Sequence, residues 1–339
     1  MSVALRRGAA TAASLAALAI AASVVDAQVA SDSAQMPPLP WMHWNDGAAD
    51  CTSSAQPPLE VHAYDASTFI LRESLCATAE GPFLYLLVGL DRALLIDTGD
   101  ITDAREMPLA RTVMALLPVR GGARIPLIVV HTHRHLDHRA GDAQFAGLPG
   151  VQVVGYDISS VRAFYRFSAW PNRAAPLDLG GRVIDVLPTP GHNETDLVFY
   201  DRATTLLFSG DFLLPGRLLV DDADAYRASA RRLAAFVHDR PVRYVLGGHV
   251  ERNAAGDVYA WGTHSHPDER GLAMNRSDVM ALPAFADRFN GFYSESDGVE
   301  MLNDVRVLTA VCVVGLALVG AFVAAVVAVI RRRRRARTR

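Results

Sequence analysis

The sequence predicts an α/β protein, with sheets covered by helices, followed by one C-terminal transmembrane helix. Three observations support this fold class. Short apolar runs alternate with amphipathic stretches, hydrophobic residues make up 50% of the 339-residue chain, and an uncharged stretch near the end precedes a run of arginines. A chain of this length and apolar content can bury the core of one large domain or of two ordinary ones.

The first 27 residues have the pattern of a secretory signal peptide. Arg6 and Arg7 precede an Ala-, Leu-, Ile- and Val-rich run from Gly8 to Val25, which closes on the small residue Ala27. An uncleaved anchor helix is the alternative, because the run is long although only weakly apolar. Both interpretations place the residues that follow outside the cytoplasm, and the export route stays open.

Residues 28–58 are rich in Pro, Ala, Ser and Asp and show no sustained period, which predicts a linker or a wrapped N-terminal arm. We expect Trp41 and Trp44 to dock on the body of the protein rather than to bind a ligand. Cys51 and Cys76 belong to the exported part, where disulfides persist. Sequence supplies no distance test, so a disulfide between them and a pair of buried thiols both stay open.

Residues 59–301 form one predicted domain, because no repeat and no break in composition divides them. The expected strands are 83–88, 93–96, 127–130, 151–154, 183–187, 197–200, 205–208 and 244–246. Amphipathic helices are expected over 107–117 and 223–238, with a shorter one over 140–145. Several strands end in polar turns, and polar residues beyond strand ends are the usual components of an active site in layered folds.

Residues 307–330 are an uncharged stretch of 24 residues, long enough to span a bilayer. A buried core helix is the alternative, but such helices usually carry a polar face, and this stretch offers little beyond Thr309 and Cys312. The tail, residues 331–339, contains seven arginines. Arginines that flank a span stay in the cytoplasm, so the C-terminus is predicted inside and the domain outside, in the periplasm or at the cell surface.

The charge distribution bears on the partners of the protein. Between residues 28 and 330 the chain has 24 basic and 35 acidic side chains, a net charge near −11. An acidic surface repels phosphate backbones, which argues against nucleic acid as a substrate. The basic tail is better explained by contact with lipid headgroups, so the expected partners are the bilayer and a small-molecule substrate. The oligomeric state stays open.

A dense polar cluster follows the predicted strand 127–130. Residues 131–138 contain four histidines and one aspartate, His131, His133, His135, Asp137 and His138. In an extended loop, residues two apart project to the same side, so His133 and His135 can hold one metal ion. Where the chain turns into a helix, Asp137 and His138 can face a second ion. Imidazole and carboxylate suit Zn²⁺ or another first-row divalent ion.

Three single residues complete the expected ligand set. His192, Asp211 and His249 each lie on a tight, glycine-containing turn near an apolar strand. For any one of them alone, an ordinary hydrogen-bonded side chain is as good an explanation. Together with the cluster before them, they predict a two-metal site.

These residues resemble the pattern of the metallo-β-lactamase superfamily of hydrolases. The family pattern is His-x-His-x-Asp-His, then Gly-His, then an Asp after a strand, then a final His, and residues 133–138, His192, Asp211 and His249 supply each in order. The resemblance covers about residues 59–251. It implies a four-layer αββα sandwich, in agreement with the alternation of strands and helices.

The resemblance also implies a role for each residue. His133, His135 and His192 would hold the first metal ion, while Asp137, His138 and His249 would hold the second, with Asp211 bridging the two. Asp97 would brace the histidine loop without binding metal. His131 has no role in the pattern and is expected to be structural. The ions would be zinc, with iron or manganese as alternatives.

The implied mechanism is hydrolysis by a hydroxide that two cations make available near neutral pH. Asp137 would be catalytic, orienting the hydroxide or passing a proton to the leaving group. β-Lactamases lack the aspartate that matches Asp211, so the sequence resembles instead the glyoxalase II, thioesterase and lactonase branch. The expected substrate is an ester, thioester or lactone of a small molecule.

Two other functions remain open at this point. One is a mono-iron persulfide dioxygenase of the same superfamily, and the other is a membrane-tethered metal-binding module without chemistry, against which the complete ligand set argues. Residues 263–269 are interpreted as a polar surface loop rather than a lid over the site. Arg72 and Glu80 are interpreted as salt-bridging residues.

Overall fold

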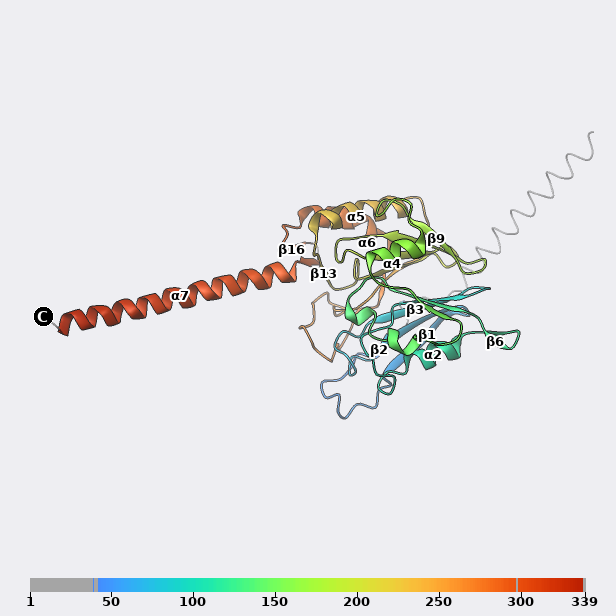
Figure 1. Cartoon of the computed structure of the whole chain (residues 1–339), viewed down its shortest axis with the longest axis horizontal. Helices are drawn as coiled ribbons and strands as arrows, with labels where there is room; N and C mark the ends of the chain where they lie inside the picture. Colours follow the sequence, from blue (N-terminus) through green and yellow to red (C-terminus); the bar gives the residue numbers. More distant parts are fainter. Residues whose placement is uncertain (1–38, 40–41, 297, 338–339) are drawn as a thin grey trace, which may run out of the picture.

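The body of the protein is built around two six-stranded sheets. A computed structural model describes residue 39, residues 42–296 and residues 298–337. The predicted signal peptide, residues 1–27, lies outside the described residues. The first sheet has the order β1-β2-β3-β4-β7-β8 and the second β15-β14-β12-β11-β10-β9, and the two lie one above the other (Figure 1).

The strands of the first sheet are β1 (Leu59–Asp65), β2 (Thr68–Glu73), β3 (Phe83–Val88), β4 (Ala93–Ile96), β7 (Leu127–Val130) and β8 (Val151–Val153). Those of the second are β9 (Ala175–Asp178), β10 (Val183–Pro188), β11 (Leu197–Asp201), β12 (Leu206–Gly210), β14 (Tyr244–Gly247) and β15 (Ala273–Met274). In each sheet the central strands are buried along their whole length, because both faces are covered.

Helices cover the outer face of each sheet. The helices are α2 (Leu109–Leu116), the 3₁₀ turn η2 (Leu136–His138), α3 (Asp142–Phe145), α4 (Ile158–Tyr165), α5 (Ala223–Val237) and α6 (Arg276–Arg288). One apolar cluster joins the two sheets, a second joins the first sheet to α2 and Phe145, and a third joins the second sheet to α5 and α6. Three clusters between four layers make an αββα sandwich, as the sequence predicts.

The eight predicted strands and three predicted helices all form, with ends shifted by at most about two residues. Thr205 was expected to begin a strand, but its φ of 58° lies in the left-handed region and β12 begins one residue later. The sequence did not predict α4 or α6. Helix α6 contains Pro283, which weakens a helical pattern, and α4 is only eight residues long.

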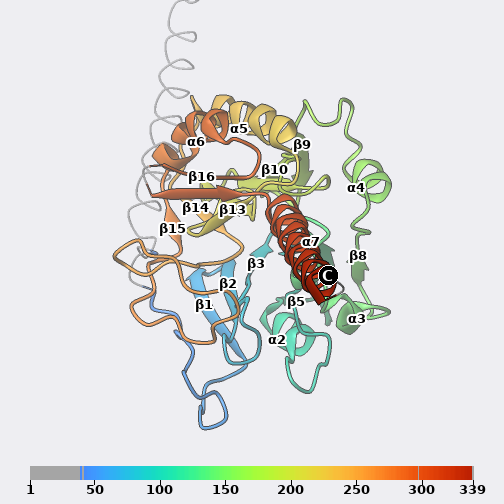
Figure 2. The same cartoon turned by 90° about the vertical axis from the view of Figure 1, so that its left-hand side faces the viewer.

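A small third sheet leads into the long C-terminal helix. Its strands are β13 (Arg217–Leu219), β17 (Val299–Leu302) and β16 (Tyr293–Ser296), and a separate hairpin pairs β5 (Val119–Arg120) with β6 (Ala123–Arg124). Helix α7 (Asp304–Arg337) leaves the body from the third sheet (Figures 1 and 2). It is long and apolar enough to cross a membrane, and no part of its apolar stretch is buried against the body.

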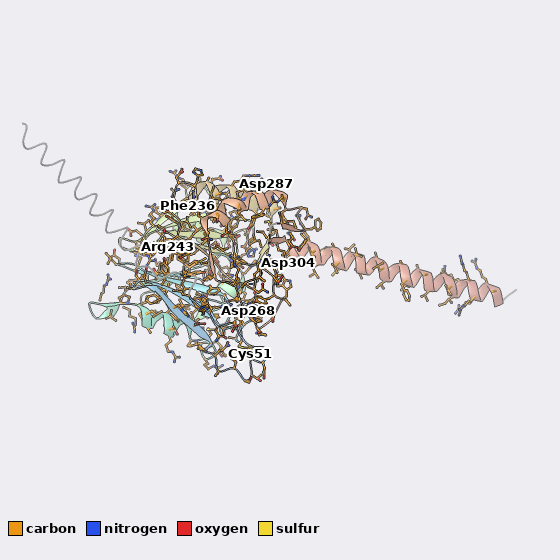
Figure 3. The ribbon with its side chains drawn as sticks, turned by 180° about the vertical axis from the view of Figure 1, so that it is seen from behind. Cys51, Phe236, Arg243, Asp268, Asp287 and Asp304 are labelled. Carbon is orange, nitrogen blue, oxygen red and sulfur yellow. A yellow bond between two sulfur atoms is a disulfide. The ribbon has the colours of Figure 1, made fainter. Side chains whose placement is uncertain are left out.

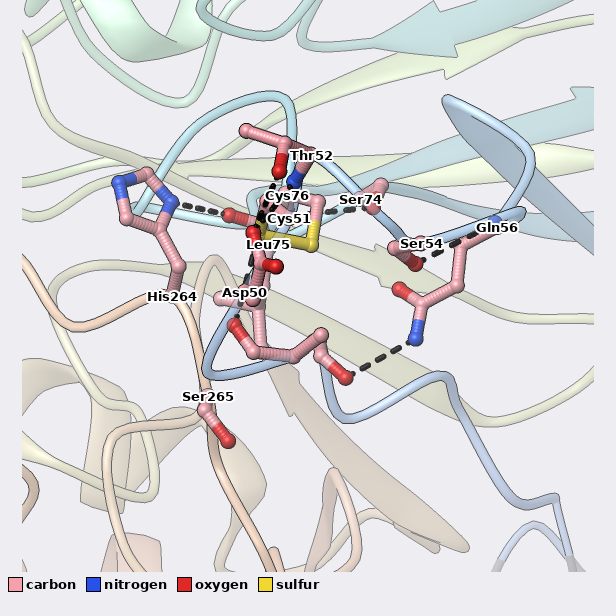
Figure 4. Close-up of a disulfide and its surroundings, with 12 residues drawn as sticks. Asp50, Cys51, Thr52, Ser54, Gln56, Ser74, Leu75, Cys76, His264 and Ser265 are labelled. Carbon is pink, nitrogen blue, oxygen red and sulfur yellow. Dashed lines mark hydrogen bonds between the residues drawn. A yellow bond between two sulfur atoms is a disulfide. The ribbon is translucent and has the colours of Figure 1, made fainter.

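Residues 42–58 lie against the body rather than forming a free linker. The ring of Trp44 contacts Phe83 edge to face, at 5.1 Å between centroids, and Trp41 lies outside the described residues. Cys51 and Cys76 form a disulfide bond that joins this arm to the loop after β2 (Figure 4). The choice that the sequence left open is therefore decided by tertiary structure, which brings the two α-carbons to 5.2 Å.

The segment 263–269 is not an ordinary polar surface loop. His266 is buried, and Glu269 forms a two-pronged ion pair with Arg72, with both N···O distances at 2.7 Å. The side chain of Arg72 is only 2% exposed. His264 donates to the carbonyl oxygen of Leu75 beside the disulfide (Figure 4). The polar side chains are buried because they bond to one another, a pairing that local sequence does not reveal.

Candidate metal centre

The loop that follows β7 is fixed by hydrogen bonds to Asp97, which directly follows the neighbouring strand β4. Oδ1 of Asp97 accepts from the backbone N of Thr132 (2.7 Å), and Oδ2 accepts from the Thr132 hydroxyl (2.8 Å) and from Nδ1 of His138 (2.9 Å). Gly99 is required nearby, because its φ is 73° and a Cβ would lie 2.1 Å from Oε1 of Glu73. Asp97 thus braces the histidine loop, as expected.

The first group of predicted ligands comes together at one edge of the two packed sheets. Nε2 of His133 lies 2.9 Å from Nδ1 of His135, and Nε2 of His192 lies 3.2 Å from each of these atoms. Ligands of a tetrahedral zinc ion with bonds of 2.0–2.1 Å lie roughly 3.3 Å apart. Three ring nitrogens at this spacing are arranged as ligands of one ion, although His192 lies far along the chain from the other two.

The second group lies directly beside the first. Nε2 of His138 lies 3.2 Å from Oδ2 of Asp137, and Nε2 of His249 lies 3.3 Å from the same oxygen. The ligand atoms of Asp137, His138, Asp211 and His249 all lie within 4.8 Å of one another. Gly248 is required here, since a Cβ would lie 2.3 Å from Oδ1 of Asp211.

Asp211 lies between the two groups. Its Oδ2 is 3.4 Å from Nε2 of His138 and 3.8 Å from Nε2 of His192, so one carboxylate reaches a member of each group. Oδ1 is buried and has no hydrogen-bond partner among the described residues. A buried carboxylate oxygen without a donor is costly, and a cation satisfies it.

The ring nitrogens that point away from the centre are mostly held by acceptors. Nδ1 of His192 donates to the carbonyl oxygen of Leu219 (3.1 Å), and Nδ1 of His249 donates to that of Glu80 (2.7 Å). A carbonyl oxygen only accepts, so Nδ1 carries a proton and Nε2 is the nitrogen that faces the centre. His138 is held in the same tautomer by Asp97. This is the usual support of metal-binding histidines.

The electrostatics of the two groups differ. Burial lowers the pKa of His133 well below its usual value and that of His192 to about 4, so both rings are neutral and ready to bind metal. Burial also acts on His249, but Asp211 and Asp137 outweigh it and raise its pKa to about 10. The second group thus carries an excess of negative charge, which a divalent cation would balance.

The residues fit a pair of divalent ions. Five imidazoles and two carboxylates suit zinc and other first-row metals, and the spacing, the tautomers and the oxygen of Asp211 without a donor agree with this. The sequence-predicted ligands are all brought together. His131 is excluded from both groups, because its Nε2 lies 2.8 Å from Oδ1 of Asp142.

A cavity of about 290 Å³ opens over the centre. Besides the predicted ligands, its walls include Glu80, Asp100, Leu136, Arg217, Leu219 and Trp261. Among these residues, only Glu80 could be singled out from the sequence. Their side chains come from the loops after β2 and β4, from η2, from β13 and from the segment after β14, so no local motif marks them. Glu80 was expected to form a salt bridge, but it lies in the cavity wall instead.

Comparison with known proteins agrees with this geometry. Residues 77–249 match the model of the metallo-beta-lactamase superfamily. The chain is 28% identical over 224 residues to an acyl-coenzyme A thioesterase, MBLAC2, of Gallus gallus, covering 56% of this chain and 80% of that enzyme. It is 30% identical over 168 residues to a hydroxyacylglutathione hydrolase of Cereibacter sphaeroides, covering 45% of this chain and 58% of that enzyme's length.

A solved metallo-beta-lactamase from Hirschia baltica is 17% identical, with a TM-score of 0.46 over 68% of this chain and 98% of the other. The family match covers half of the chain and includes the first six predicted ligands and ends at the seventh, His249. The chain belongs to the metallo-beta-lactamase superfamily.

Proposed function

We propose that this protein is a membrane-tethered hydrolase with two metal ions, which cleaves an ester, thioester or lactone of a small molecule. His133, His135 and His192 would hold the first ion, and Asp137, His138 and His249 the second. The observation that carries the proposal is Asp211, whose carboxylate reaches both ligand groups and has an oxygen without a donor.

Two divalent ions at this centre would lower the pKa of water and polarise a carbonyl group. The side chains of the protein would position the substrate and the attacking water, and would move the proton of that water. Neighbouring histidines hold the pKa of Asp137 far below its usual value despite burial, so it is a carboxylate at neutral pH. It lines the cavity and would take the proton of the attacking water.

The bond changes then balance. The water oxygen bonds to the acyl carbon, the bond from that carbon to the leaving oxygen or sulfur breaks, and Asp137 returns the proton to the leaving atom. The products are an acid and an alcohol or thiol, and no oxidant or reductant is needed.

The cavity wall favours substrates without negative charge near the centre. Glu80 and Asp100 line the wall as carboxyl groups outside the predicted ligands, whereas Arg217 is its single arginine or lysine among the described residues. That guanidinium already pairs with Glu251 and stacks on Trp261 at 3.9 Å from the ring centroid. Both named relatives act on thioesters by their names, which supports an acyl substrate. The acidic wall supports a leaving group with less negative charge than the coenzyme A or glutathione in the names of these relatives.

We place the domain, residues 59–301, outside the cytoplasm, held by a membrane span over 307–330 with a cytoplasmic tail over 331–339. The apolar length of α7 and the arginines after it support this arrangement. The disulfide between Cys51 and Cys76 supports it independently, because disulfides persist in oxidising compartments. The segments 1–27 and 28–58 would be a signal peptide and an arm, of which residues 42–58 lie against the domain.

Metal analysis and a substrate panel test the chemistry. Full-length protein in detergent should contain close to two metal ions per chain and hydrolyse at least one of a set of aryl esters, thioesters and lactones. A β-lactam and a phosphodiester serve as comparison substrates. A protein that contains a single iron and consumes oxygen with a persulfide would instead be a dioxygenase. Two ions with no turnover of any substrate would identify a metal-binding module.

Protease added to intact spheroplasts of cells that express the protein tests the topology. The domain should be degraded while an epitope after residue 331 stays protected. Complete protection of the domain would place it in the cytoplasm and refute the arrangement.

A further inference from the structure

Helix α7 is joined to the body without a linker. β17 ends one residue before Asn303, and α7 begins at Asp304. Asn303 is buried, and its side-chain amide donates to the carbonyl oxygens of Val220 (2.7 Å) and Asp221 (3.0 Å). Its Oδ1 accepts from the backbone N of Arg306 (2.8 Å), which caps the helix. The body therefore fixes the direction in which α7 starts, beside the labelled Asp304 (Figure 3).

The start of the apolar stretch lies close to this joint. Arg306 is the last charged residue before the uncharged stretch 307–330, and the four helical steps from Asn303 to Val307 advance only about 6 Å along a helix. The headgroup layer on each side of a bilayer is roughly 5–8 Å thick. When the stretch occupies the hydrocarbon, the body surface around Asn303 must therefore lie against the headgroups.

The wall of the metal-centre cavity belongs to the same surface. β17 pairs in parallel with β13, and Leu302 lies opposite Leu219. Leu219 lines the cavity, and its carbonyl oxygen accepts from Nδ1 of His192. One inter-strand spacing, about 4.8 Å, thus separates the strand that leads into α7 from the strand that supports a predicted ligand.

Exposed apolar side chains gather on this side of the molecule. Leu136 and Trp261, each 58% exposed, line the cavity. Phe292 and Tyr293 are 49% and 44% exposed, and the carbonyl oxygen of Phe292 accepts from the backbone N of Asn303. Viewed from the side that α7 leaves, β16 and the orange segment between β14 and β15 lie beside the start of the helix (Figure 2). Aromatic side chains favour the membrane interface.

We infer that the cavity opens onto the lipid surface in which α7 is anchored, and that its substrate is a neutral amphiphilic ester or thioester drawn from that surface. Leu136 and Trp261 form the apolar rim of the cavity, and Phe292, outside the cavity, contacts the same lipid surface. Glu80 and Asp100 disfavour anionic headgroups within the cavity. The inference rests on the proposed function, because it needs both the membrane span and acyl hydrolysis.

Depth measurements test the orientation. Full-length protein with Cys312→Ser, to remove the free thiol, carries a single added cysteine from Phe292→Cys, Leu136→Cys or the control Val119→Cys. Val119 is also exposed, but its hairpin lies on the opposite side of the body from α7 (Figure 1). In phosphatidylcholine vesicles with brominated chains, a fluorophore at position 292 or 136 should be quenched at least about threefold more than one at position 119. Equal quenching at the three positions would refute the orientation.

Kinetics test the source of the substrate. The double variant Phe292→Ser, Tyr293→Ser lies outside the cavity, so it should hydrolyse a short, water-soluble ester at the wild-type rate. Its turnover of a long-chain ester held in the same vesicles should fall about tenfold, because less apolar surface reaches the lipid. Unchanged turnover of the vesicle-bound ester would refute the inference, and so would an equal loss with both esters.

Failure of the proposed function is distinguishable from failure of the orientation. Release of the wild-type protein from vesicles by alkaline carbonate would show that α7 does not span the bilayer, which refutes the anchor. Retention in carbonate with equal quenching at positions 292 and 119 would leave the anchor intact and refute only the orientation. Absence of hydrolysis of both esters would refute the chemistry, whatever the quenching shows.

Discussion

At the scale of single residues, we propose that Asp211 joins the two ligand groups into one centre. A bridging carboxylate offsets the repulsion between two dications and fixes their separation. In the variant Asp211→Ala we expect the second site to lose its ion first, because His138 and His249 then lose a neighbouring negative charge. Hydrolysis should fall by at least about 100-fold, as for other ligands and their immediate supports. Metal content per chain and turnover are the measurements.

A matched control separates this effect from a general loss of charge. Asp239→Ala removes an exposed carboxylate whose contact is with the exposed His238, and it should leave both metal content and turnover unchanged. His133→Ala should instead empty the first site. An Asp211→Ala protein that keeps two ions and full activity would contradict the bridging role.

Glu73 gives a pH dependence to the stability of the metal-free protein. Burial raises the pKa of this carboxyl to about 8, although the backbone N of Asp100 donates to it. Between the unfolded value near 4.5 and about 8, the folded state holds a proton that the unfolded state has lost. Stability should therefore fall as the pH rises through this window, by at most about 1.4 kcal/mol per pH unit.

The variant Glu73→Gln isolates this effect, since an amide has the same shape and does not titrate. Urea unfolding of the chelated protein at several pH values should give a smaller decline for the variant than for the wild type. An identical slope in the two proteins would show that Glu73 is ionised at neutral pH in the folded state.

At the scale of elements, the ion pair between Arg72 on β2 and Glu269 fixes the segment after β14 to the first sheet. Both side chains are buried, at 2% and 8% exposure. Removal of one partner leaves the other charge buried and unpaired, so Glu269→Ala should cost about 3–5 kcal/mol of unfolding free energy. Asp287→Ala breaks the exposed pair with Arg231 and should cost less than about 1 kcal/mol.

Urea midpoints at constant slope measure the two variants. The double variant Arg72→Met, Glu269→Leu should recover most of the loss, because no unpaired charge remains. Equal midpoints for Glu269→Ala and Asp287→Ala would show that the buried pair contributes no more than a surface contact.

At the scale of the whole molecule, we expect the fold not to depend on bound metal ions. Three apolar clusters hold the four layers together, and the predicted ligands lie at one edge of them. A chelator should therefore abolish hydrolysis while a single cooperative urea transition remains, unlike in a small zinc finger. Circular dichroism and activity should be followed on one sample, and loss of the cooperative transition on chelation would contradict this expectation.

The sequence alone determined the layered fold class, the central strands and the seven predicted ligands. The strands were visible because apolar runs such as 83–88 are buried on both faces, and the ligands because polar residues follow those strands directly. His133 and His135 are also two residues apart, so local geometry already brings them together. The length and lack of charge of 307–330 were equally plain.

Only the tertiary structure decided the disulfide, the buried Arg72–Glu269 pair and the walls of the cavity. Each of these joins residues far apart in the chain, and Glu269 is 197 residues from Arg72. Arg217 and Trp261 have no local pattern, because their place in the cavity depends on how β13 and the segment after β14 pack. The role of Asn303 at the start of α7 could not be predicted from the sequence either, because it arises from hydrogen bonds to residues about 80 positions earlier. The period of the apolar residues predicts which face of a helix or strand is buried. Packing in the tertiary structure decides which other element covers that face.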